Sequence, residues 1–128
     1  ILTDNKIGDE GAIALSQVCD KKYSIKKMSL YKNNISDRGA ISFAHALKNS
    51  NLKWLSFMNN KITVNGAVEF IETLTHNTKL ELILVGNNVN YNDLILKLVE
   101  KNKDSIIHSL LNNIEENNFE CALTRCRF

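Results

Sequence analysis

Apolar and polar residues along this chain follow two periodicities that succeed each other several times. Around Leu30 they alternate, so in a strand Met28 and Leu30 would point to one side and Ser29 and Tyr31 to the other. Apolar residues then recur every three or four positions, as on one face of a helix. These residues are Ala40, Phe43, Ala44 and Leu47, and one unit later Phe70, Ile71 and Leu74. The pattern predicts repeated units of a short strand followed by a helix.

The units are similar in sequence as well as in pattern. Residues 2–12, 30–40 and 57–67 align without gaps, and each segment carries an Asn, an Ile two residues later and a Gly-Ala pair. The shared Asn residues are Asn5, Asn33, Asn60 and, in a degenerate fourth copy, Asn88. The period is therefore 27 to 28 residues. Such units cannot bury their apolar faces alone and are expected to stack on their neighbours.

The apolar residues before each Asn follow the pattern L-x-x-L-x-L-x-x-N. They are Ile25, Met28 and Leu30, then Leu52, Leu55 and Phe57, then Leu80, Ile83 and Val85. Over residues 1–90 the chain resembles leucine-rich repeat proteins of the ribonuclease-inhibitor-like class, whose repeats are long and contain a helix. The resemblance implies an α/β fold: a right-handed solenoid, or horseshoe, with parallel strands on the concave face and helices on the convex face.

Three residue types in the repeat have a structural explanation. The Asn amide both donates and accepts, so it can satisfy backbone groups where each strand ends. Small residues at Ala12, Ala40 and Ala67 suit a helix that lies close against the sheet. Acidic residues such as Asp9, Glu10 and Asp37 stand where helices begin, and the helix dipole favours them there.

The two ends of the chain depart from the repeat. Apolar spacing predicts two helices between residues 93 and 118, with Asp104 as an N-cap between them, so residues 91–128 are expected to form a degenerate last repeat and a helical C-terminal cap. Leu2 already occupies the third apolar position of its strand, which leaves the first edge open. We therefore expect either the C-terminal part of a longer array or an edge that pairs with another copy.

Outward strand positions form a predicted partner-binding surface on the concave face. They are Lys27, Ser29, Tyr31, Trp54, Ser56, Met58, Leu82 and Leu84. Trp, Tyr and Met are common in interface hot spots, so this cluster favours protein binding. Two alternatives stay open: the C-terminal tail covers the surface, or Leu82 and Leu84 are buried under the cap.

Composition narrows the function classes. The 128 residues are 44% apolar, which suits one packed domain, and a net charge of +2 gives no reason to expect nucleic acid or a membrane as partner. The chain shows no secretory signal, and three Cys do not make a disulfide scaffold. A cytoplasmic location is expected, which would be a host cytosol for a bacterial effector.

No cofactor, metal site or catalytic residue is predicted. Cys19 aligns with core Leu positions, Cys121 and Cys126 lack a zinc-ligand spacing, and the three His are dispersed. The sequence therefore favours a protein–protein interaction module over an enzyme. One alternative, from resemblance to the Ran GTPase-activating protein, is a regulator of a small GTPase. Another is a pure scaffold fragment of a larger sensor or effector protein.

Overall fold

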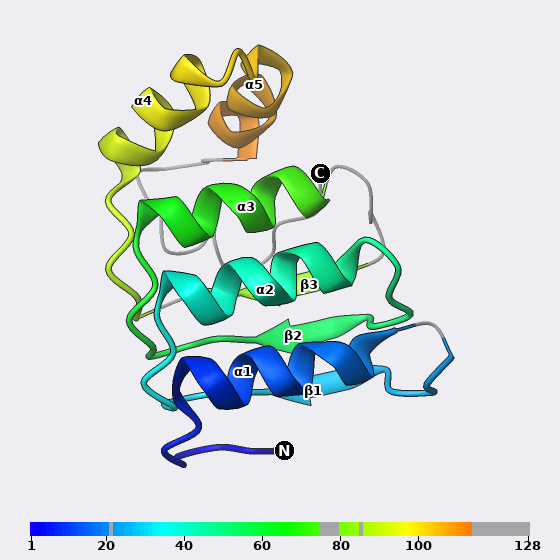
Figure 1. Cartoon of the computed structure of the whole chain (residues 1–128). Helices are drawn as coiled ribbons and strands as arrows, with labels where there is room; N and C mark the ends of the chain where they lie inside the picture. The colour runs from blue at the N-terminus through cyan, green and yellow to red at the C-terminus, as the bar shows by residue number, and fades with distance from the viewer. Residues whose placement is uncertain (21, 75–79, 85, 114–128) are drawn as a thin grey trace.

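The chain forms a three-stranded parallel sheet with helices along one of its faces (Figure 1). The structure is a computed structural model that describes residues 1–20, 22–74, 80–84 and 86–113. The elements in chain order are α1 (Gly8–Ser16), η1 (Gln17–Cys19), β1 (Lys27–Ser29), α2 (Asp37–Leu47), β2 (Trp54–Ser56), α3 (Val64–Leu74), β3 (Glu81–Ile83), α4 (Tyr91–Glu100) and α5 (Asp104–Asn113). The predicted α/β alternation of strand and helix is confirmed.

The strands stand in the sheet in chain order, β1-β2-β3, and each pairs with the next in parallel. Lys27 lies opposite Trp54, and Trp54 lies opposite Glu81. Helices α1, α2 and α3 run side by side over one face of the sheet, and α4 and α5 lie beyond α3 (Figure 1). The sheet face turned away from α1, α2 and α3 is called the far face below.

The core fills the space between these helices and the sheet. Phe57, just after β2, contacts Phe43 of α2 with a ring-centroid distance of 5.1 Å and Phe70 of α3 at 5.2 Å. All three side chains are fully buried, together with Leu30 and Leu55 from the strand side. The predicted helical stripe is confirmed for the buried side chains of Ala40, Phe43, Ala44, Leu47, Phe70 and Ile71, while the side chain of Leu74 lies outside the described ones.

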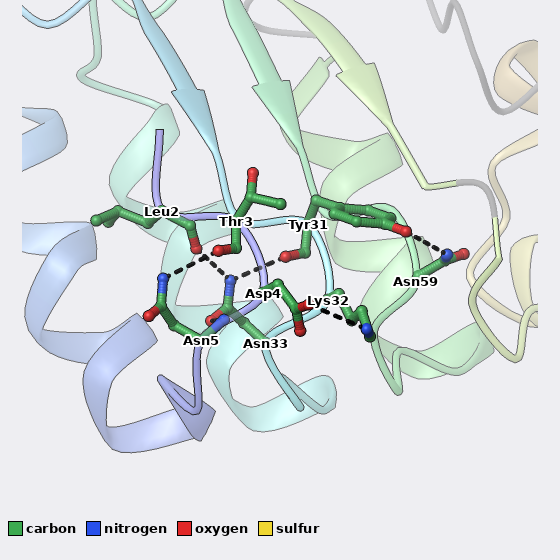
Figure 2. Close-up of polar contacts among 8 residues, drawn as sticks. All are labelled: Leu2, Thr3, Asp4, Asn5, Tyr31, Lys32, Asn33 and Asn59. Atoms are coloured by element: carbon green, nitrogen blue, oxygen red, sulfur yellow. Dashed lines mark hydrogen bonds and ion pairs between the residues drawn. The ribbon is translucent and has the colours of Figure 1, made fainter.

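An asparagine at the end of each strand links neighbouring units. The Oδ1 of Asn60 accepts hydrogen bonds from the backbone N–H groups of Asn33 and Ile35, both at 3.0 Å. Its Nδ2 donates to the carbonyl oxygens of Leu30 at 2.8 Å and Phe57 at 2.9 Å. Asn33 makes equivalent contacts one unit earlier: its Oδ1 accepts hydrogen bonds from the N–H groups of Asn5 and Ile7. Its Nδ2 donates to the carbonyls of Leu2 and Tyr31 (Figure 2). The predicted role of the Asn column is confirmed for both residues.

An aspartate near the start of α1 caps the next helix. The Oδ1 of Asp9 accepts hydrogen bonds from the N–H groups of Ser36 at 2.8 Å and Gly39 at 3.1 Å, and its Oδ2 accepts one from the Ser36 hydroxyl. Burial by itself raises the pKa of Asp9, but these hydrogen bonds and the charge of Arg38 outweigh it and hold the pKa below its usual value. Asp37 repeats the arrangement on α3. Both carboxylates are structural, as predicted, but each caps its neighbour's helix.

The helices approach one another closely where these caps lie. A Cβ placed on Gly66 would stand 2.6 Å from Asp37 Oδ1 and 3.3 Å from the Cβ of Ala40. Ala40 is fully buried, as are Ala12 and Ala67. The prediction that these positions need small residues agrees with the burial. For Ala12 and Ala40, however, the nearby element is the next helix.

The third strand is displaced by one residue from the register expected from the sequence. Because Leu82 pairs with Leu55, its side chain belongs to the core, where it is 0% exposed, and Leu84 is 2% exposed. The expectation that Leu82 and Leu84 face a partner is therefore wrong. Ile83, expected in the core, is partly exposed on the far face.

The displacement has a simple physical origin. Asn87, and not Asn88, takes the place of Asn60 in the fourth unit: its Oδ1 accepts from Ile62 N–H at 2.9 Å, and its Nδ2 donates to Phe57 and Leu84 carbonyls. Residues 80–84 carry three leucines in one phase of a strand and Glu81 with Ile83 in the other, so the apolar Ile83 reduces the contrast between the two faces. With Asn88 at the motif position, the expected register is one residue too late, and every side chain of the strand is then expected on the opposite face.

Two helices follow the sheet, as predicted for this part of the chain. Asn90 caps α4 through its own side chain, which accepts a hydrogen bond from Asp93 N–H at 3.1 Å. Asp104 is the first residue of α5 and not the residue before it. Lys101 joins α4 to α3 through ion pairs with Glu69 at 3.3 Å and Glu72 at 3.1 Å. In the described part of the chain, no helix is both long and apolar enough to span a membrane.

Candidate protein-binding surface

The far face is built from the strand residues that alternate with the core. Strand pairing sets Lys27, Trp54 and Glu81 in one row across β1, β2 and β3, and Ser29, Ser56 and Ile83 in a second row. Lys27 is exposed, and Trp54 and Glu81 are partly exposed. A large aromatic side chain therefore lies at the centre of the sheet with a charged residue on each side.

The second row is much smaller in side-chain volume over β1 and β2. Ser29 and Ser56 are only 8% and 4% exposed, because larger neighbours stand on either side along the strands. The Ser29 hydroxyl lies 3.4 Å from that of Thr3. The prediction that both serines face outward agrees with the strand alternation, but their side chains contribute little surface.

The residues that follow β1 and β2 extend the face. Tyr31 and Met58 are equivalent positions and are both partly exposed. The Tyr31 hydroxyl accepts a hydrogen bond from Asn59 Nδ2 at 3.3 Å, so the ring reaches across toward the next unit (Figure 2). This bond orients the Tyr31 ring beside Met58 rather than leaving it free to rotate.

The residues at the strand ends, which form the rim of the far face, share one backbone conformation. Asp4, Lys32, Asn59 and Gly86 all have positive φ, at 55°, 56°, 55° and 74°. At three of them a residue with a Cβ adopts a conformation that L-residues seldom visit. Asp4 and Lys32 also form an exposed ion pair of 3.1 Å (Figure 2). The rim is therefore polar, while the centre is aromatic.

The structure brings together four of the eight predicted contact residues as accessible side chains. These are Lys27, Tyr31, Trp54 and Met58. Glu81 and Ile83 belong to the same face and were missed from the sequence, because β3 was placed one residue out of register. The constant 27-residue spacing of Lys27 and Trp54 could have found Glu81.

No catalytic or metal-binding arrangement emerges from the described residues. Among them, no group of three or more His, Cys, Asp or Glu could hold a metal ion. Cys19 is buried in the core as predicted, and burial raises the pKa of its thiol to about 11, so it stays protonated at neutral pH. Cys121 and Cys126 lie outside the described residues. Arg38 lies in the first turn of α2 and pairs with Glu10 on the helix side of the sheet.

The first residues add an edge to the sheet. The N–H of Leu2 donates to the carbonyl of Ser29 at 3.0 Å, and that of Asp4 donates to the carbonyl of Tyr31 at 2.9 Å. Leu2 is 37% exposed, whereas Leu30, its equivalent in the next unit, is fully buried. This edge therefore presents apolar surface of the kind that the other units bury.

Sequence and fold comparisons agree with this architecture. The family described as "Leucine Rich repeat" matches residues 1–16 and 48–70. No curated protein sequence matches the chain. The chain therefore carries leucine-rich repeats in two short segments.

Twelve chains of solved structures match this one. One of them is titled "Leiomodin-1 Actin-Binding Site 2 (ABS2)" and superposes with a TM-score of 0.61 at 16% sequence identity. The match covers 86% of this chain and 84% of the leiomodin chain. At this identity the likeness shows the fold alone.

Proposed function

We propose that this protein is a non-enzymatic protein-binding module whose far face binds a partner protein. The observation that carries the proposal is Trp54, a large aromatic side chain left partly exposed at the centre of a rigid sheet. Aromatic residues in such central positions dominate the binding energy of many interfaces. Tyr31 and Met58 extend this apolar centre, and the polar rim around it matches the usual anatomy of an interface.

The far face suits this role because the opposite face of the sheet is already occupied. The core-facing side chains of all three strands pack under α1, α2 and α3, so of the two faces of the sheet the far face is the one that a partner can reach without unfolding. The backbone at the strand ends is held by the hydrogen bonds of Asn33 and Asn60, which we call the Asn ladder. These bonds order the far face before a partner binds. A surface that is ordered in advance loses less conformational entropy on binding.

The test is a binding titration with a partner isolated by affinity capture and then purified. Trp54→Ala should raise the dissociation constant at least fivefold, which is a loss of about 1 kcal/mol or more in binding free energy. Tyr31→Ala should raise it to a smaller extent. The matched control is Leu96→Ala, which removes an apolar side chain that is 62% exposed on α4, away from the sheet. Equal affinity of Trp54→Ala and Leu96→Ala, with both variants folded, would overturn the proposal.

We also propose the finer architecture that the sequence resemblance implies. The far face would be the concave side of a right-handed leucine-rich repeat horseshoe of the ribonuclease-inhibitor-like class, with repeats over residues 1–90. Residues 91–128 would form the degenerate last repeat and the C-terminal cap, of which residues 114–128 lie outside the described residues. Support comes from the Asn ladder and from the way α4 begins with its own Asn90 cap instead of an Asp from the preceding unit. A cytoplasmic location fits the buried free thiol of Cys19.

Two other roles and one candidate partner can be tested. Regulation of a small GTPase would appear as faster GTP hydrolysis when the protein is added to a panel of GTPases. A pure scaffold role would leave partner binding insensitive to every far-face substitution. The leiomodin likeness names actin as a defined protein for the same titration, and Trp54→Ala tests whether any binding uses the far face.

A further inference from the structure

The row of Lys27, Trp54 and Glu81 carries a positive charge at one end and a negative charge at the other. Strand pairing places a lysine on β1, an indole on β2 and a glutamate on β3 directly opposite one another. Within the described ranges, no ion pair joins Lys27 or Glu81 to another side chain. Both charges are therefore available to groups of opposite sign on a partner.

The spacing of this row favours a helix over an extended chain. Neighbouring strands lie about 4.8 Å apart, so the two charges are separated by roughly 10 Å, with Trp54 midway. One face of an α-helix offers side chains at i, i+3 or i+4, and i+7, which lie about 5 to 6 Å and 10.5 Å along its axis. An extended chain crossing the strands offers same-face side chains every ~6.7 Å and is out of step by the third strand.

The width of the face also matches a helix. Tyr31 and Met58 form a parallel line about 13 Å along the strands from Lys27 and Trp54, with the small Ser29 and Ser56 between the two lines. A helix lying across the strands is roughly 10–12 Å wide with its side chains, which is close to the distance between the two lines. Large residues would then flank the helix on both sides.

We propose that the far face binds an amphipathic α-helix of the partner protein, lying across the strands. An acidic side chain of this helix pairs with Lys27, apolar side chains at i+3 and i+4 pack on Trp54, and a basic side chain at i+7 pairs with Glu81. The inference rests on the proposed function, because it names the chemistry of the element that the far face binds.

The test uses designed helical peptides and the single tryptophan of the chain. Three Trp-free peptides of about 16 residues, long enough to form a helix, differ only at positions i and i+7: one acidic and one basic, both acidic, or both basic. The emission of Trp54 reports occupancy of the far face directly. The mixed peptide should bind about fivefold more tightly than either single-sign peptide, and added salt should narrow the difference.

Charge variants of the surface should redirect this preference. Glu81→Lys should bind the both-acidic peptide best, and Lys27→Glu should bind the both-basic peptide best. Glu81→Gln, which removes a charge without inverting it, should bring the mixed and both-acidic peptides to similar affinity. Circular dichroism confirms that each variant is folded before titration.

Two results would overturn the inference. Equal binding of all three peptides to the unaltered protein would show that Lys27 and Glu81 do not select the partner. Absence of any peptide-induced change in Trp54 emission would show that the far face does not bind such a helix. Neither result touches the proposed function, which stands on the titration of the purified partner with Trp54→Ala.

Discussion

The carboxamide of Asn60 serves two repeat units at once. It is only 7% exposed, and it hydrogen-bonds to backbone groups of both the unit that contains it and the unit before it. Those backbone groups lie where the strand ends and have no ladder partner of their own. A buried polar group without a partner costs about 1–3 kcal/mol, so one side chain prevents several such losses.

We predict that Asn60→Ala lowers the free energy of unfolding by about 3 kcal/mol or more, because at least two buried N–H groups lose their acceptor. Urea denaturation followed by Trp54 emission measures this change. Asn65→Ala is the matched control, since Asn65 is exposed in the first turn of α3. A loss below about 1 kcal/mol for Asn60→Ala, similar to that of the control, would contradict the role given to the ladder.

Asp9 should make stability depend on pH in the acid range. Its pKa in the folded protein lies below the unfolded value of about 3.9, so its contribution is complete above that value. The contribution is lost as pH falls through the lowered pKa. We expect Asp9→Asn to be less stable than the unaltered protein at pH 6 and the gap between them to narrow as the pH falls below the unfolded value and through the lowered pKa. A gap that is constant over this range would show that the carboxylate charge is not what caps α2.

At the scale of single residues, the sequence predicts most of this chemistry. Asn33 and Asn60 are identified because each stands at one fixed distance after an unambiguous strand. Asn87 was missed because Asn88 lies beside it, and spacing that varies between 27 and 28 residues accepts either. The cross-unit caps by Asp9 and Asp37 were also beyond prediction, since sequence shows only that an acid begins a helix.

Among the elements, β3 is the one whose buried face the sequence pattern predicts least clearly. β1 and β2 each carry polar residues in the outward phase, so their faces follow from alternation alone. In β3 the outward phase combines Glu81 with the apolar Ile83, so the contrast between its two faces is weaker, and pairing with β2 shows that Leu82 is buried and Ile83 faces out. The helices, by contrast, were predictable because their apolar stripes are bounded by polar residues.

The register of β3 can be tested by substitution of two adjacent residues. Leu82→Ala should cost about 2–5 kcal/mol of folding free energy, as expected for a fully buried leucine. Ile83→Ala should cost less than about 1.5 kcal/mol, because its side chain is partly exposed. Denaturation curves of the two variants measure these losses. A larger loss of folding free energy for Ile83→Ala than for Leu82→Ala would support the register expected from the sequence instead.

The first and the last of the described units differ. Beyond α3, helix α4 packs against the stack and is held by the ion pairs of Lys101. At the other end, Leu2 exposes surface that Leu30, Phe57 and Leu84 bury in the remaining units. An unpaired apolar edge of this kind promotes association between chains.

We predict that the protein self-associates through this edge as its concentration rises. Leu2→Lys should shift the equilibrium toward the monomer, because a charge at the edge opposes both apolar packing and strand pairing. Sedimentation velocity over a range of concentrations measures the effect, with Leu96→Lys as a control at an exposed site on α4. Identical behaviour of the Leu2→Lys variant and the unaltered protein would exclude the edge as the contact.

The central claim is that the far face, with Trp54 at its centre, is where a partner protein binds. Labelling with 5-fluorotryptophan gives a single fluorine resonance, because the chain contains one Trp. The account predicts that this resonance shifts or broadens as the purified partner is added and stops changing at saturation. A resonance that is unchanged when the protein is fully bound would contradict the claim, because the partner would then be bound elsewhere on the molecule.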